Sequence, residues 1–261
     1  MKKIKISAAL ATFNEEKNIV DCIESLKQFT DEVVVVDGQS QDRTVELAEK
    51  LQAKVVKTTN KPMFHINKNL AIANCTGNWI FMIDADERVT KELASEIKQV
   101  VKLNPKENGF WVNRANWFLG GFLKKGGVYP DRVIRLFRRG KGKLPEKSVH
   151  EQVKIDGSVG YLENDLLHFA DPHFQRYLER ADRYTQLTAK EISQKNPGRS
   201  LLIFIYYLII KPIFIFIDIY IRHKGYVDGF RGFIWAFFSA SHHFFAYVKY
   251  WEGVKDAKSR S

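Results

Sequence analysis

The stretch WIFMIDADERV, which runs from Trp79 to Val89, joins a run of apolar residues directly to the carboxylates Asp84, Asp86 and Glu87. A short apolar run of this kind is typical of a strand buried inside a sheet. Two aspartates separated by one residue at the end of a strand point the same way and lie roughly 6 to 7 Å apart in an extended chain. That spacing suits a divalent cation such as Mg²⁺ or Mn²⁺, which shares its remaining positions with a phosphorylated ligand. The same residues also fit a solvated turn in which Asp86 or Glu87 caps the segment that follows.

The residues before this stretch predict strands and helices in alternation. Strands are expected at residues 4–10, 33–36 and 53–58, and the four consecutive valines of the second suit burial on both faces. Helices are expected between them, because apolar residues recur at helical spacing, and Asn14 is placed to cap the first helix. This order predicts a doubly wound α/β domain, which binds ligands at the carboxyl ends of its strands. The carboxylates after Trp79 therefore lie where such a fold binds substrates.

The composition limits the partners and the compartment. The chain has 261 residues, enough for a sizeable core, and its formal net charge of +11 favours anionic partners such as nucleic acid, phosphorylated small molecules or an acidic membrane. Cys22 and Cys75 lack the spacing of a zinc site and provide no disulfide framework, so a reducing cytosol is expected. The N-terminal apolar run is too short for the core of a signal peptide, so we expect a protein that is not exported.

Three ordered motifs carry a family resemblance. They are ALATFNEEKNIVDCIESL (residues 9–26), VVVVDGQSQDRT (33–44) and KNLAIANCTGNWIFMIDADE (68–87). In these motifs the first 100 or so residues resemble the family-2 glycosyltransferases, which use the GT-A form of the α/β fold. The resemblance implies a nucleotide-sugar donor and a Mg²⁺ or Mn²⁺ cofactor.

The resemblance also implies a role for individual residues. The residues it implies to line the nucleotide pocket are Thr12, Asn14 and Glu15; Asp37 would face the base, and Lys68 stands where many relatives carry Arg. Asp84 and Asp86 would hold the ribose, the metal and the diphosphate. Each residue also has a purely structural interpretation: Asn14 as a helix cap, Asp37 as a turn former and Lys68 as a solvated helix residue.

An inverting sugar transfer needs a base on the far side of the donor to take a proton from the acceptor hydroxyl. Glu151, in LPEKSVHEQV, is the candidate, and Val-His-Glu at this place resembles a later motif of the subset that includes lipopolysaccharide-core glucosyltransferases. Glu146 and Asp131 are rival bases, and the alternative for Glu151 is a carboxylate paired with a nearby arginine. His150 or His168 could add a metal ligand, although a lone histidine is more often structural.

The segment 124–143 has eight basic residues and one acid, Asp131. Arg135 and Arg138 are predicted to clamp a phosphate of the donor or of a lipid-linked acceptor, because guanidinium groups fit phosphate oxygens. Aromatic residues are interleaved with this charge, as a base-stacking surface for RNA would require, but sugars also stack on aromatic faces. The nucleotide-sugar pocket implied upstream favours a carbohydrate acceptor over nucleic acid.

The C-terminal part has two long apolar stretches. Residues 200–221 are long enough to cross a bilayer, which takes about 20 residues, but Lys211, Pro212 and Asp218 argue against a span. A second aromatic stretch follows at residues 229–251. Both are interpreted as amphipathic helices in a membrane interface, with basic residues toward anionic lipid. A hairpin packed on the catalytic domain or on a second subunit, and a single true span, are the alternatives.

The combined prediction is a GT-A catalytic domain at residues 1–170, with a nucleotide-sugar half at 1–103 and an acceptor half at 104–170. Residues 171–261 form a helical extension that associates with the membrane or with another subunit. The protein would transfer a hexose, with glucose as the family-level expectation, to a glycolipid or surface-polysaccharide precursor at the inner face of the cell membrane. A non-catalytic nucleotide- or glycan-binding membrane module is the alternative from another class.

Overall fold

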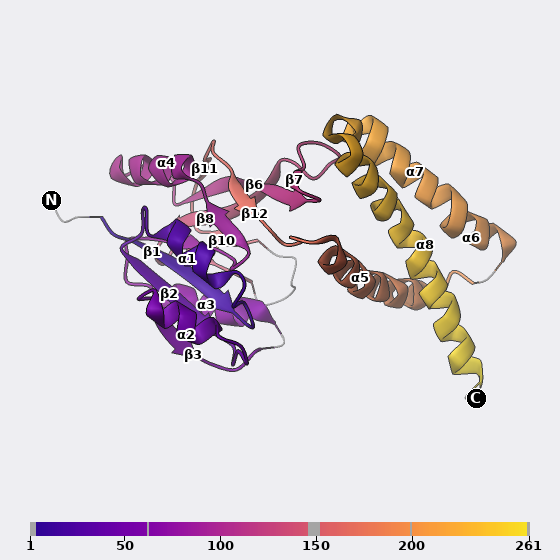
Figure 1. The fold of residues 1–261 in the computed structure, drawn as a ribbon, viewed down its shortest axis with the longest axis horizontal. Coiled ribbons are helices and arrows are strands. Elements are labelled where there is room, and N and C mark those ends of the chain that lie inside the picture. Colours follow the sequence, from indigo (N-terminus) through magenta and orange to yellow (C-terminus); the bar gives the residue numbers. More distant parts are fainter. Residues whose placement is uncertain (1–3, 62, 146–151, 199, 260–261) are drawn as a thin grey trace. The chain divides into compact units, whose positions relative to one another are not determined.

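The computed structural model describes residues 4–61, 63–145, 152–198 and 200–259, and the side chains as far as Gly253. The chain forms two compact units, each described here by itself (Figure 1). The α/β unit comprises Met1–Ala115 and Asp131–His168, and the helical unit comprises Asn116–Pro130 and Phe169–Ser261.

The α/β unit contains a mixed sheet whose first half is parallel. In the order β3-β2-β1-β4 it comprises β3 (Lys54–Lys57), β2 (Glu32–Asp37), β1 (Ile6–Thr12) and β4 (Trp79–Met82). The second half continues in the order β8-β6-β12-β5 with β8 (Asp131–Arg138), β6 (Gly109–Phe118), β12 (Leu166–His168) and β5 (Glu87–Val89). Since β8 runs antiparallel to β4, the sheet is doubly wound in its first half only. Short strands complete the unit: β11 (Val159–Tyr161) beside β6, and β9 (Gly142–Lys143) paired with β10 (Lys154–Ile155).

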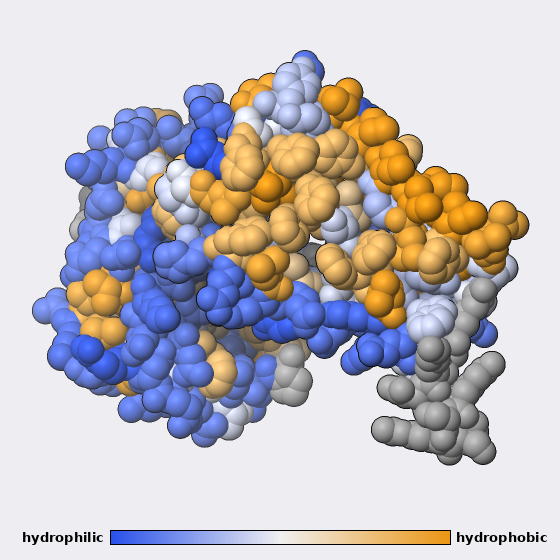
Figure 2. Space-filling view, turned by 45° about the vertical axis from the view of Figure 1, so that its right-hand side comes forward, coloured by the Kyte–Doolittle hydropathy of each residue, from blue (hydrophilic) through white to orange (hydrophobic). Residues whose placement is uncertain are grey.

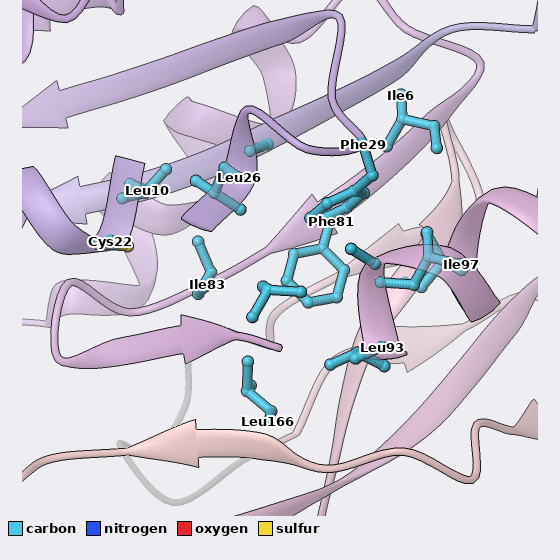
Figure 3. Packing of buried hydrophobic residues seen from close by; sticks show 14 of the residues in the cluster. Ile6, Leu10, Cys22, Leu26, Phe29, Phe81, Ile83, Leu93, Ile97 and Leu166 are labelled. Atoms are coloured by element: carbon cyan, nitrogen blue, oxygen red, sulfur yellow. The ribbon is translucent and has the colours of Figure 1, made fainter. Parts of the chain in front are cut away.

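Alternate residues of each parallel strand face two different helix layers. Trp79 and Phe81 of β4 pack into the cluster formed with α1 (Ile19–Leu26), α2 (Thr44–Lys50) and α4 (Lys91–Lys102). Figure 3 shows this cluster around Phe81, whose ring meets that of Phe29 edge to face at 5.3 Å. Ile80 and Met82 pack into the opposite cluster, which contains residues of α3 (Phe64–Asn74). The apolar run is therefore buried on both faces, as its composition predicts.

The helical unit consists of long helices with π-helical turns. It comprises α5 (Phe174–Lys195), α6 (Leu201–Ile205), η1 (Tyr206–Ile210), α7 (Lys211–Ile217), η2 (Asp218–Arg222), η3 (Gly225–Asp228) and α8 (Gly229–Ser259), with the short strand β7 (Gly121–Phe122). The chain from α6 to η2 is helical throughout, and it packs along α8 as a hairpin. A side chain at Gly232 would place its Cβ 1.8 Å from the Gly225 carbonyl oxygen, so only glycine allows α8 to pass η3 this closely.

The segment Asn116–Pro130 belongs to the helical unit, although the sequence places it in the acceptor half at 104–170. Two contacts account for this difference. The backbone N–H groups of Lys124 and Lys125 donate to the Asp228 carboxylate at 2.8 to 3.1 Å, and Phe118 packs edge to face on Tyr177 and Trp235. The three partners lie about 60 to 120 residues further along the chain, so no local pattern predicts the pairing.

Candidate active site

The parallel strands bring the predicted site residues to one edge of the sheet. In register, Thr12 of β1 lies opposite Asp37 of β2, and Ala9 of β1 lies opposite Met82 of β4. The loops that follow β1, β2 and β4 therefore leave the sheet side by side. This edge is the place where parallel α/β sheets bind ligands.

The first wall of the site is formed by Thr12 and Asp37. The Thr12 hydroxyl donates to Asp37 Oδ1 at 3.1 Å, and the backbone N–H of Ser40 donates to Asp37 Oδ2 at 2.9 Å. The Ser40 hydroxyl donates to Asp37 Oδ1 at 2.5 Å. Asp37 is buried and accepts two of these hydrogen bonds from Ser40 in its own loop and one from Thr12 of β1, so it shapes the turn after β2 and ties it to β1.

Asn14 joins the loops after β1 and β2 and does not cap the first helix. The N-cap of α1 is Asn18, four residues later than expected. Asn14 has φ +56°, its N–H donates to Ser40 Oγ at 2.8 Å, and its Oδ1 accepts the N–H of Gln41 at 2.7 Å. The N–H of Glu15 donates to Thr44 Oγ1 at 2.8 Å. All of these bonds join the segment after β1 to the segment after β2, so the two loops form one wall.

Asp84 is held by two cationic side chains. One of its carboxylate oxygens pairs with Lys68 Nζ of α3, and the other accepts from Arg135 Nη2 of β8 at 2.7 Å. Burial by itself would raise the pKa of Asp84, but the charges of Lys68 and Arg135 outweigh it and hold this pKa well below its usual range. Asp84 is therefore ionised at neutral pH.

Glu87 is a fully buried carboxylate for which the sequence suggests only a capping role. It accepts from Arg135 Nη2 at 2.5 Å and from Arg114 Nη1 at 3.5 Å, and its Oε2 accepts the N–H of Asp84 at 3.0 Å. Arg114 also pairs with Asp131 through two bonds of 2.7 and 2.9 Å. A buried carboxylate needs such partners. Its position three residues after Asp84 is the signal that could have identified it.

Asp86 lies beside His168 of β12. The His168 Nε2 atom is 3.5 Å from Asp86 Oδ2, and the Asp86 side chain is 30% exposed. Burial by itself would raise the pKa of Asp86, but the hydrogen bond and charge of His168 outweigh it and lower this pKa. β12 pairs with β5 so that His168 lies opposite Glu87, which places a histidine predicted as a metal ligand next to the acidic motif.

Arg138 lies away from this cluster, against the prediction that it clamps phosphate together with Arg135. β8 runs antiparallel to β4, so Arg138 pairs in register with Trp79 at the start of β4, whereas Arg135 reaches its end. The Arg138 guanidinium lies 4.5 Å from the Trp79 ring centroid and donates to Asn104 Oδ1 and Pro105 O. Arg135 itself is buried and bound to carboxylates, so it is a partner of Asp84 rather than an open phosphate clamp.

The predicted base Glu151, its rival Glu146 and His150 lie outside the described residues. The residues on either side of them are anchored beside α3. His65 Nδ1 lies 3.0 Å from the Pro145 carbonyl oxygen, and the Asn69 side chain exchanges two hydrogen bonds with the Leu144 backbone. Val153 is buried in the same cluster as Leu144.

Residues 7–146, more than half of the chain, match the model of a protein family described as glycosyl transferase family 2. The chain belongs to this family. The family-2 glycosyltransferase is 30% identical over 254 residues to the lipopolysaccharide core biosynthesis glycosyltransferase LpsC of Rhizobium meliloti (strain 1021), with 92% of each chain covered. It is 27% identical over 268 residues to an uncharacterized glycosyltransferase of Rickettsia felis (strain ATCC VR-1525 / URRWXCal2), with 98% of this chain and 92% of the relative covered.

Solved structures confirm the predicted GT-A-type fold of this glycosyltransferase. Residues 1–349 of TarS from S. aureus superpose with a TM-score of 0.51 at 16% identity, covering 92% of this chain and 91% of that one. The same TarS fragment in complex with UDP gives a TM-score of 0.50 at 18% identity, covering 87% and 75%. At these identities the likeness concerns the fold alone.

Proposed function

We propose that this glycosyltransferase moves a hexose, with inversion, from a nucleoside diphosphate sugar to a glycolipid or surface-polysaccharide precursor. The observation that carries the proposal is the acidic motif at the carboxyl edge of the parallel strands. There Asp84 is fixed by Lys68 and Arg135, and Asp86 is partly exposed beside His168. The name of LpsC supports a lipopolysaccharide-type acceptor, and the TarS complex supports UDP as the nucleotide. Glucose is the family-level choice of sugar.

The residues present fit a Mg²⁺ or Mn²⁺ ion at Asp86. Among the described residues there is no ready group of three or more His, Cys, Asp and Glu ligands. This suits a cation that keeps water and the diphosphate in most of its positions and takes one or two protein ligands. Asp86 and His168 are the residues that would hold it, and the imidazole favours Mn²⁺ over Mg²⁺. When bound, the ion would neutralise charge on the leaving diphosphate.

The remaining residues position the donor and the acceptor. Asp84 is ionised and held by Lys68, so it can accept hydrogen bonds from the ribose, and the loop wall of Thr12, Asn14 and Asp37 receives the base. Glu151 is the proposed base because it ends the Val-His-Glu motif, which resembles a later motif of this family. Its rival Asp131 is already paired with Arg114 at 2.7 Å.

The acceptor chemistry favours action at the inner face of the cell membrane. A lipid-linked acceptor stays in the bilayer, so the enzyme has to work at its surface. The apolar helical segment Leu201–Arg222 supports this location: it has 22 residues, is long and apolar enough to cross a membrane, and has no buried side chain in its most apolar part.

The test is release of UDP from UDP-hexoses, with the donors first screened by thermal shift with and without Mn²⁺. Asp86→Ala should lower turnover by about 10³-fold, because a Lewis-acid cation supplies several kcal/mol of transition-state stabilisation. Glu24→Ala, which removes a half-exposed carboxylate of α1 that pairs with Lys27, is the matched control and should leave turnover unchanged. Glu151→Gln should retain donor binding and lose sugar transfer.

Two outcomes would support other functions. Tight, saturable donor binding without turnover of any sugar would favour a non-catalytic binding module. Strongly salt-dependent binding to RNA, with no response to nucleotide sugars, would favour the nucleic-acid interpretation of the segment 124–143.

A further inference from the structure

The first arm of the helical hairpin, from α6 to η2, has two chemically different sides. Lys211 lies 5.2 Å from the ring of Tyr207, which stacks on Tyr247 of α8 at 4.8 Å, so this side of the arm faces α8. Asp218 is seven residues after Lys211 and so lies on the same side of the helix. The other side carries only large apolar residues that are half or more exposed: Ile210 (54%), Ile213 (54%), Phe214 (68%), Ile217 (51%) and Ile221 (56%).

The second arm, α8, continues this apolar surface. Phe230, Phe233 and Phe237 are exposed and recur at helical spacing. Phe233 lies 5.7 Å from Phe216 and 5.9 Å from Tyr220 between ring centroids, so the two arms present one continuous face. Figure 2 shows hydrophobic side chains gathered over the helical unit. Exposed apolar surfaces of this extent mark contact with a membrane or with another protein.

A cationic cluster lies where the two arms of the hairpin join. The turn contributes Arg222 and Lys224, and the segment 116–130 contributes Lys124 and Lys125; all four are exposed. The two segments are tied together by the Gly126 N–H, which donates to His223 O at 2.9 Å, and by Asp228, which accepts from the Lys124 and Lys125 backbones. Asp218 and Asp228 are the carboxylates nearby, so cations exceed them two to one. Asp228 is engaged with the backbone, which leaves the lysine side chains to face solvent.

We propose that this surface docks on an anionic phospholipid bilayer, with the apolar face of both arms among the upper acyl chains and the cationic cluster among the headgroup phosphates. In such a bilayer the anionic headgroups lie above the hydrocarbon chains, and on this surface the cationic cluster lies beside the apolar face in the same way. The hairpin lies in the interface rather than across the membrane, because end-on insertion would carry the four cations of this cluster through the hydrocarbon core. The inference deepens the proposed membrane location and rests on it, but docking needs neither donor nor acceptor.

The test is co-sedimentation of the full chain with vesicles of phosphatidylcholine alone and with about 30% phosphatidylglycerol. The wild type should bind the anionic vesicles at least about tenfold more tightly, and added salt should weaken binding. Ile213→Glu with Ile217→Glu should abolish binding to both vesicles. Lys124→Glu with Lys224→Glu should lose only the preference for anionic lipid.

The matched controls lie in the α/β unit. Leu103→Glu replaces a side chain that is 80% exposed, and Lys17→Glu reverses an exposed charge, so both should bind like the wild type. Since all replaced residues are exposed, circular dichroism and thermal unfolding should match the wild type. UDP release, measured without vesicles, separates a failure of docking from a failure of sugar transfer.

Three results would overturn the proposal. One is no binding to either vesicle, with light scattering revealing a dimer that the Ile213→Glu, Ile217→Glu variant dissociates; the face would then join two copies. Another is equal binding to neutral and anionic vesicles. The third result comes from a fluorophore attached to the cysteine of the Lys224→Cys variant. Cys22 and Cys75 are buried, so the label should react with the new cysteine. If vesicles protect this fluorophore from an aqueous quencher, the turn crosses the bilayer.

Discussion

The turn from Asp84 to Glu87 is stabilised by hydrogen bonds within it and by ion pairs with Arg135. The Glu87 N–H donates to Asp84 O at 3.0 Å, and the Asp84 N–H donates to the Glu87 carboxylate at 3.0 Å. Arg135 binds both carboxylates from β8. Removing one member of a buried ion pair leaves an uncompensated charge, so this turn depends on all three side chains.

We expect Glu87→Gln to lower the free energy of unfolding by about 3 to 5 kcal/mol, because Arg135 would keep its charge without its closest carboxylate. Urea unfolding followed by circular dichroism measures this loss. Glu24→Gln, which breaks an exposed pair with Lys27, is the control and should cost less than about 1 kcal/mol. Equal losses in the two variants would contradict the structural role of Glu87.

Glu32 should make stability depend on pH. Partial burial by itself raises the pKa of Glu32, but hydrogen bonds from the Ser7 hydroxyl and from the backbone and side chain of Thr76 outweigh it and lower the pKa. A carboxylate with a lowered folded-state pKa contributes stability above its unfolded pKa and loses it as the pH falls through the folded pKa. The contribution should therefore be complete at pH 7.

Glu32→Gln should be less stable than the wild type at pH 7 by about 1 to 3 kcal/mol, the range for hydrogen bonds to charged groups. The difference in stability should shrink as the pH falls below the pKa of an ordinary glutamate, which is 4.5. Urea unfolding at a series of pH values measures it. Glu49→Gln, on the exposed side of α2, is the control, and a constant gap between Glu32→Gln and the wild type would refute the assignment.

The loops after β1 and β2 act as one element, although 25 residues separate Thr12 from Asp37. Their bonds run from one loop to the other: Asn14 to Ser40 and Gln41, Glu15 to Thr44. The parallel register of β1 and β2 makes this possible, because it places both strand ends at the same level. The wall formed by these loops, which is the proposed binding surface for the donor, thus depends on strand pairing and not on either loop alone.

Asn14→Ala should raise the KM for the nucleotide sugar by about tenfold and change kcat less, because it removes the bond to the Gln41 N–H and places alanine at φ +56°. Asn14→Gly keeps the backbone conformation and should have a smaller effect. Steady-state kinetics with varied donor measure both. A glycine variant as impaired as the alanine variant would mean that the side chain, and not the loop conformation, sets donor affinity.

The two units have separate cores and should respond separately to ligand. The α/β unit is built on the clusters around Phe81 and Ile80, and the helical unit on those around Tyr247 and Phe118. Units of this size with their own cores are expected to unfold in separate steps. The edge proposed to bind the donor lies in the α/β unit alone.

UDP with Mn²⁺ at 100 times the Kd should therefore stabilise the α/β unit by about 2.7 kcal/mol and leave the helical unit unchanged. Hydrogen exchange with mass spectrometry measures the two units in one experiment. Exchange should slow in peptides from β1, β2 and β4, and its rate should not change in peptides from α5 and α8. A uniform increase in protection over the whole chain would mean that the units unfold together.

The sequence alone determined the parallel half of the sheet, the family and which loops meet at the carboxyl edge of the parallel strands. Periodicity and apolar runs indicate burial directly, so the strands that contain Val33–Val36 and Trp79–Met82 can be predicted without knowing which strands they pair with. The loops that follow such strands must share an edge, which brought Thr12, Asp37, Asp84 and Asp86 together. The roles of these residues in sugar transfer stay predictions.

Only the tertiary structure decided what depends on pairing between distant segments. It pairs Arg135 with Glu87 and places Arg138 at the opposite end of β4. It also places His168 beside Asp86 and bonds the Lys124 backbone to Asp228. The physical reason is that an antiparallel strand or a returning helix fixes which residues meet by its register. Register is a property of two segments at once, and neither segment contains it by itself.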